Sequence, residues 1–191
     1  MRLFELAGNN PHSDTAVFTF GRFNPPTIGH EALVDKVKQV AKQMDADHFV
    51  FISPTHRPPK DPLDWNTRVE IAKQAFPGAN IWNDPSIKNP FEALEALGED
   101  YKKVILVVGS DRVEKFKSGM EPYLNDFGIE DFDVISAGER DPDADGVSGM
   151  SASKARELAM NGEWEKFAAS LPAGVSETDK KKAYNLIRKN I

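Results

Sequence analysis

The chain has 191 residues, no cysteine and a formal net charge of −6. This length predicts a single domain, and the lack of cysteine excludes disulfides, thiolate metal sites and cysteine nucleophiles. The acidic balance argues against nonspecific nucleic-acid binding, and no apolar run approaches the ~20 residues that span a bilayer. With no signal-peptide core after the first residues, we expect a cytoplasmic protein without a membrane or nucleic-acid partner.

Strands and helices are predicted to alternate along the chain. Short apolar, β-rich segments predict strands over residues 16–20, 48–53, 79–82, 104–108 and 132–137. Apolar residues at helical spacing, with capping residues before them, predict helices over about 29–44, 65–76, 151–161 and from 177, a short helix from 90 and a weak one after 111. A flexible loop is predicted over residues 141–149, which are rich in Asp and Gly.

The alternation predicts an α/β fold, a Rossmann-like doubly wound parallel sheet of about five strands with helices on both faces. We expect residues 1–170 to form this domain and residues 171–191 to be a C-terminal helical extension of it. In such sheets, ligands bind beyond the carboxyl ends of the strands. Polar segments follow several of the predicted strands, so the site is expected at that edge.

The segment from Gly21 to His30, Gly-Arg-Phe-Asn-Pro-Pro-Thr-Ile-Gly-His, links the first predicted strand to the first helix. Gly21 permits a close approach of the backbone to a ligand, and the two prolines stiffen the loop. Gly29 and His30 lie at the helix amino terminus, where unpaired N–H groups and the helix dipole favour an anion. Thr27 and His30 can donate hydrogen bonds to phosphate oxygens. The segment therefore predicts a phosphate site.

This segment resembles the Gly-x-Phe-x-Pro-x-(His/Thr)-x-Gly-His signature of the nucleotidylyltransferase superfamily. That superfamily includes nicotinamide and nicotinate mononucleotide adenylyltransferases, phosphopantetheine adenylyltransferase and small cytidylyltransferases. Residues 150–156, Met-Ser-Ala-Ser-Lys-Ala-Arg, resemble its second signature and also stand at a helix start. The resemblance implies transfer of a nucleoside monophosphate from a nucleoside triphosphate to a small phosphate-bearing acceptor, with release of pyrophosphate.

The resemblance also implies roles for individual residues. His30 and Thr27 would hold the α-phosphate, and Arg156, Ser151 and Ser153 would hold the β- and γ-phosphates. Because the acceptor phosphate is already ionised, catalysis would be mainly positioning and charge stabilisation. The catalytic residues implied are Thr27, His30, Lys60 and Arg156. The nucleotide-binding residues implied are Gly21, Arg22, Phe23, Asn24, Gly29, His30, Gly109, Asp111, Met150, Ser151, Ser153 and Arg156.

The basic stretch from Ser53 to Lys60, with Arg68 after it, resembles the Pro-Pro-His-Lys…Arg stretch of the mononucleotide adenylyltransferases. It implies that Arg57, Lys60 and Arg68 bind the acceptor. The residues alone also allow a solvated basic loop here, with Arg68 in a surface ion pair. Asp111 after the fourth predicted strand resembles the family's Gly-x-Asp, but it can also cap a helix.

No metal-ligand set stands out, and the resemblance implies Mg²⁺ held mainly by the triphosphate and water. AMP transfer from ATP to nicotinamide or nicotinate mononucleotide is our first hypothesis. CTP with a sugar or alcohol phosphate is an alternative, because Thr27 replaces the usual first histidine and nothing fixes the base. A non-catalytic nucleotide-binding module is another, because Ala152 and Ser153 depart from the second signature. A homo-oligomer is left open.

Overall fold

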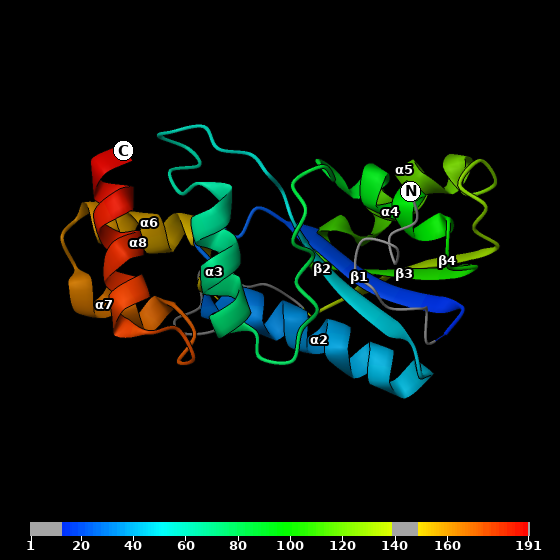
Figure 1. Cartoon of the computed structure of the whole chain (residues 1–191), viewed down its shortest axis with the longest axis horizontal. Coiled ribbons are helices and arrows are strands. Elements are labelled where there is room, and N and C mark those ends of the chain that lie inside the picture. Colours follow the sequence, from blue (N-terminus) through cyan, green and yellow to red (C-terminus); the bar gives the residue numbers. More distant parts are fainter. Residues whose placement is uncertain (1–12, 139–148, 191) are drawn as a thin grey trace.

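The structure, a computed structural model, describes residues 13–138 and 149–190 (Figure 1). One parallel sheet has the order β2-β1-β3-β4, formed by β1 (Thr15–Gly21), β2 (Asp47–Ile52), β3 (Lys103–Val108) and β4 (Asp131–Ser136). The helices are α2 (Ile28–Met44), α3 (Trp65–Ala75), α4 (Pro90–Gly98), α5 (Val113–Met120), α6 (Ala152–Met160), α7 (Trp164–Ser170) and α8 (Glu177–Asn190), with 3₁₀ turns at Ser110–Arg112 and Glu121–Tyr123.

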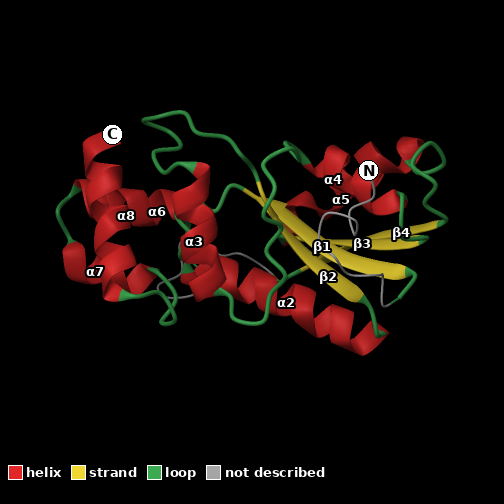
Figure 2. Ribbon diagram, in the orientation of Figure 1, coloured by secondary structure: helices red, strands yellow, loops and turns green. Residues whose placement is uncertain are grey.

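Helices cover both faces of the sheet (Figure 2). Successive strand residues point to opposite faces, so Val17 packs with Val37 of α2, whereas Phe18 packs in a cluster with Leu94 of α4 and Met120 of α5. β1, β2 and β3 are buried over most of their length and largely apolar, which made them readable from the sequence. The edge strand β4 is more exposed and carries Asp131 and Asp133. The predicted Rossmann-like α/β fold is confirmed.

The sheet has one strand fewer than the five expected, among the residues described. Residues 79–82 make only an isolated parallel bridge between Ile81 and Val50 of β2, the edge strand. Val50 N donates to Asn80 O at 2.9 Å, and Trp82 N donates to Val50 O at 2.9 Å. The segment lies between two turns and is too short for a longer ladder, although it occupies the position of a fifth strand.

Helices α3, α6, α7 and α8 gather at one end of the molecule, beyond β1 and β2 (Figure 1). Their apolar residues, including Ile71, Ala155, Phe167 and Ile187, form one cluster with the loop after β1. The sequence patterns did not predict α7. The loop expected at 141–149 lies outside the described residues except for Gly149, as does segment 1–12. None of the helices within 13–138 and 149–190 is long and apolar enough to cross a bilayer.

Candidate active site

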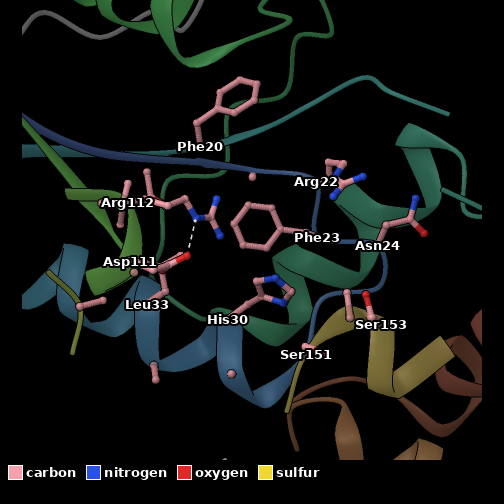
Figure 3. Close-up of a pocket in the computed structure, with 18 of the residues that line it drawn as sticks. Phe20, Arg22, Phe23, Asn24, His30, Leu33, Asp111, Arg112, Ser151 and Ser153 are labelled. Atoms are coloured by element: carbon pink, nitrogen blue, oxygen red, sulfur yellow. Dashed lines mark ion pairs between the residues drawn. The ribbon is translucent and has the colours of Figure 1, made fainter. Parts of the chain in front are cut away.

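A cavity of about 260 Å³ opens at the carboxyl edge of the sheet, where β1 and β3 lie side by side. The chain leaves β1 for β2 on one side and later returns to β3 on the other, so this is a topological switch point of the kind at which α/β proteins bind ligands. The cavity is lined by the end of β1 and the loop after it, the start of α2, the turn after β3 and the start of α6 (Figure 3), together with Asp61 from the loop between β2 and α3 and residues 137–138 after β4.

The structure brings together most of the residues predicted to bind nucleotide. The cavity is lined by Gly21, Arg22, Phe23, Asn24, Gly29, His30, Gly109, Asp111, Ser151, Ser153 and Arg156. It does not place Met150 there. The Met150 side chain instead packs against the apolar cluster of α3 and α6–α8, where a thioether is better accommodated than beside phosphates.

The His30 ring is oriented by Thr27. Thr27 N donates to His30 Nδ1 at 3.1 Å, and Thr27 Oγ1 lies 2.9 Å from the same nitrogen. A backbone N–H can only donate, so Nδ1 must accept, and the proton of the neutral ring resides on Nε2. Phe23 packs beside the imidazole with ring centroids 4.8 Å apart (Figure 3). His30 therefore offers an Nε2–H donor whose tautomer is fixed by the fold.

Thr27 itself does not reach the cavity. Its exposed fraction is 0%, and it caps α2 with its hydroxyl beside His30 Nδ1. The expected contact between Thr27 and the α-phosphate is therefore wrong for this arrangement. Thr27, at the N-cap of α2, orients the imidazole of His30, and a ligand in the cavity would contact His30 and not Thr27.

Gly21 gives Phe23 the room that its position requires. Phe23 is 1% exposed and adopts φ 47°, in the left-handed region that costs non-glycine residues about 1–2 kcal/mol. A Cβ added to Gly21 would stand 2.8 Å from Phe23 Cε2. Because the ring is enclosed by His30 and Phe76, it has little space to move away.

Replacing Gly21 by alanine is expected to lower the free energy of unfolding by about 1–3 kcal/mol, the cost of overpacking an enclosed side chain. Urea unfolding measures it. Gly119→Ala is the matched control, because a Cβ there would lie 3.9 Å from the nearest atom, Phe91 Cζ, in ordinary contact. Equal stability of the two variants would contradict the role given to Gly21.

Arg156 joins the two signature segments across the cavity. Its Nη1 donates to Asn24 O at 2.7 Å, and its Nη2 donates to Ser153 Oγ at 3.1 Å. Burial lowers the pKa of Arg156, and the charge of Asp61 opposes that shift. Ser151 caps α6 by accepting from Lys154 N at 3.1 Å. The amino terminus of α6 and Arg156 thus form one cationic wall, suited to an anion.

Arg68 is a structural residue, and its expected role in binding the acceptor is wrong. It is 0% exposed. Its Nη1 donates to the carbonyls of Arg22 (2.5 Å) and Ser53 (2.8 Å), Nη2 to that of Thr55 (2.8 Å) and Nε to that of Leu63 (3.1 Å). Burial lowers its pKa to about 10, so it stays cationic at neutral pH. Its hydrogen bonds hold the loops after β1 and β2 against each other.

Arg57 and Lys60 are exposed and do not line the cavity. Both lie in the loop between β2 and α3. Arg57 Nη2 stands 3.6 Å from Asp61 Oδ2, and Arg57 and Asp61 also exchange backbone hydrogen bonds of 3.2 and 2.9 Å. This part of the basic loop therefore borders the cavity through Asp61 alone.

Several cavity residues were not predicted from the sequence: Thr19, Phe20, Ala32, Leu33, Asp61, Val108, Arg112, Ala137, Gly138 and Ala152. Some had a signal. Thr19 and Phe20 end the first predicted strand, and Arg112 directly follows Asp111, with which it forms an ion pair at 3.9 Å (Figure 3). Asp61 sits in a proline-rich loop and had none.

The model of the cytidylyltransferase-like family matches residues 18–158, which extend from within β1 into α6 and include both signature segments. This chain belongs to that family. A relative named as a nicotinate-nucleotide adenylyltransferase, from Sulfurimonas denitrificans, is 28% identical over 113 residues, covering 54% of this chain and 60% of the relative. The match thus spans less than two thirds of that relative.

Three solved structures share the fold. One is named as a nicotinate-nucleotide adenylyltransferase from Vibrio parahaemolyticus (TM-score 0.58, 16% identity, 88% of this chain and 97% of that chain). Thermotoga maritima TmcAL bound with α-thio ATP gives a TM-score of 0.53 at 15% identity, over 93% and 55%. Plasmodium falciparum nicotinic acid mononucleotide adenylyltransferase complexed with NaAD gives 0.52 at 16% identity, over 93% and 96%.

Proposed function

We propose that this protein is an adenylyltransferase that transfers AMP from ATP to nicotinate or nicotinamide mononucleotide and releases pyrophosphate. The observation that carries the proposal is the hydrogen bond from Arg156 to Asn24, because it closes the two signature segments around one cavity. Family membership supports nucleotidyl transfer. The names of the relatives from Sulfurimonas and Plasmodium support the choice of ATP and of this acceptor.

The arrangement suits an in-line displacement. A phosphate oxygen of the acceptor attacks the α-phosphorus of ATP, and the bond from that phosphorus to the β-phosphate oxygen breaks as pyrophosphate leaves. His30 would donate from Nε2 to an α-phosphate oxygen, where charge develops in the transition state. Arg156, Ser153 and the amino terminus of α6 would bind the β- and γ-phosphates. No residue is needed as a strong base, because the acceptor phosphate is already ionised.

Magnesium fits this proposal as an ion carried mainly by the triphosphate. Within residues 13–138 and 149–190, no cluster of three His, Asp or Glu side chains is placed to hold a metal. The cavity carboxylates Asp61 and Asp111 are each paired with an arginine, Arg22 and Arg112. When bound, the ion would neutralise charge on the phosphates. The groups proposed to contact the magnesium–triphosphate complex are then the guanidinium of Arg156 and hydrogen-bond donors such as His30, Ser153 and the N–H groups of α6.

Pyrophosphate release tests the function directly. The purified protein is incubated with Mg²⁺ and either ATP or CTP. Each nucleotide is paired in turn with nicotinate mononucleotide, nicotinamide mononucleotide, phosphopantetheine or a sugar phosphate. We expect pyrophosphate and a dinucleotide product with ATP and a pyridine mononucleotide. Turnover with CTP alone would replace the proposal by a cytidylyltransferase. No turnover with any pair, together with tight ATP binding, would indicate a non-catalytic module.

A further inference from the structure

Asp61 is a buried carboxylate in the wall of the cavity, between two loops that each carry an exposed arginine. Its side chain is 1% exposed, whereas those of Arg22 and Arg57 are 51% and 69% exposed. Arg22 Nη1 donates to Asp61 Oδ1 at 3.1 Å, and Arg57 Nη2 lies 3.6 Å from Oδ2. One carboxylate thus has a guanidinium on each oxygen, one from the loop after β1 and one from the loop after β2.

The backbone around this trio is firmly held. Arg68 donates to the carbonyl of Arg22, and Asn24 exchanges two hydrogen bonds with Leu63, at 3.0 and 3.1 Å. The two loops therefore cannot easily separate. The two arginine side chains can still move, because they are largely exposed. Among the described residues, Oδ2 of Asp61 has no hydrogen-bond partner.

A buried charge is costly unless it is paired, so Asp61 favours keeping both guanidinium groups close to it. Each guanidinium has five N–H donors in a fixed fork, and a contact with Asp61 leaves most of them for another anion. The trio carries two positive charges and one negative charge, and therefore a net positive charge beside the cavity. Arg22 and Asp61 line the cavity near Arg156, on whose pKa both of their charges act, whereas Arg57 lies outside the cavity, beside Asp61 Oδ2.

We propose that Asp61 is a positioning residue that holds Arg22 and Arg57 together as a subsite for the phosphate monoester of the acceptor. This rests on the proposed function, and it moves Arg22 from the nucleotide side of the cavity to the acceptor side. Planar guanidinium groups match phosphate oxygens in bidentate geometry. Two flexible side chains that are already ordered lose less entropy when the phosphate binds.

Replacing Asp61 by asparagine preserves the volume of the side chain and removes the charge that attracts both arginines. We expect KM for nicotinate mononucleotide to rise about tenfold, because the two arginine side chains must then become ordered when the phosphate binds, which weakens its binding. The KM for ATP should stay close to that of the unaltered protein. Asp131→Asn is the matched control, since it removes an exposed ion pair with Lys103 (2.7 Å) at the opposite end of the sheet.

A second set of variants distinguishes positioning of the arginines from a merely structural role of Asp61. In an Arg22→Gln, Arg57→Gln double variant, adding Asp61→Asn should leave KM for the acceptor unchanged, because Asp61 acts through those arginines. An equal rise in both KM values, an unchanged acceptor KM, or a further rise in that background would each overturn the proposal.

Failure of the proposed function is recognised separately. If the unaltered protein turns over no substrate pair, the phosphate subsite is tested with ribose 5-phosphate, titrated into the unaltered protein and Asp61→Asn and followed by NMR shifts of the loop amides. Weaker binding to the variant supports the subsite. Equal or tighter binding overturns it.

Discussion

Replacing His30 by alanine is expected to lower kcat by about 10²–10³-fold, the usual cost of removing one donor to a transition-state oxygen. The reason lies in the fixed tautomer. Thr27 N donates to Nδ1, so the proton of the neutral ring is on Nε2, from which it would be donated to the α-phosphate as charge develops there during transfer. Steady-state kinetics with ATP and nicotinate mononucleotide measure it. KM for ATP should change little, because the lost bond strengthens mainly in the transition state.

The matched control is His48→Ala. His48 lies near the amino end of β2, away from the cavity, where its Nε2 contacts Gly78 O and Asn80 N. Its loss should leave kcat unchanged. If His30→Ala retained full turnover, the mechanism given to this loop would be excluded, and a large rise in KM for ATP with unchanged kcat would make His30 a simple binding residue.

Replacing Arg68 by methionine is expected to lower the free energy of unfolding by about 3–5 kcal/mol. Methionine fills the space of the aliphatic stem, but it leaves the carbonyls of Arg22, Ser53 and Thr55 without their buried donor. Such carbonyls cost free energy when they stay buried and unpaired. Equilibrium unfolding in urea, at unchanged m-value, measures the loss.

Lys73→Met provides the control, because Lys73 is an exposed cation on the same helix, α3. Arg68→Lys should recover only part of the stability, since one ammonium cannot reach carbonyls on both loops as the guanidinium fork does. A stable Arg68→Met protein that had lost only affinity for the acceptor would restore the binding role expected from the sequence.

The fold was readable because β1, β2 and β3 are largely buried and apolar. Segments such as residues 104–108 have no polar residue to break the pattern, and the alternation with helices then leaves few topologies. Caps were readable for the same local reason: Asp64 and Asn89, directly before two of the predicted helices, accept from backbone N–H groups as N-caps. The prediction of a fifth strand was wrong because pairing at a sheet edge depends on the partner strand and on the turns around the segment.

The loop from Gly21 to His30 shows where sequence reasoning stops within one motif. Its residue types predicted a phosphate site after a strand, and the structure places Gly21, Arg22 and His30 around a cavity. The sequence could not separate residues that face the cavity from residues that support them. Thr27 stands in the same motif as His30, yet it is fully buried against the imidazole and does not line the cavity.

By itself the sequence determined the fold class, the edge of the sheet at which the candidate site lies, and the family, because these follow from local periodicity and from motifs of adjacent residues. Only the tertiary structure decided which cations face a ligand. Arg68 and Arg57 looked alike as members of one basic stretch, but one guanidinium is enclosed by carbonyls and the other is exposed beside Asp61. Burial and pairing of a charge depend on segments distant in the chain, so they become visible only when the loops after β1 and β2 are brought together.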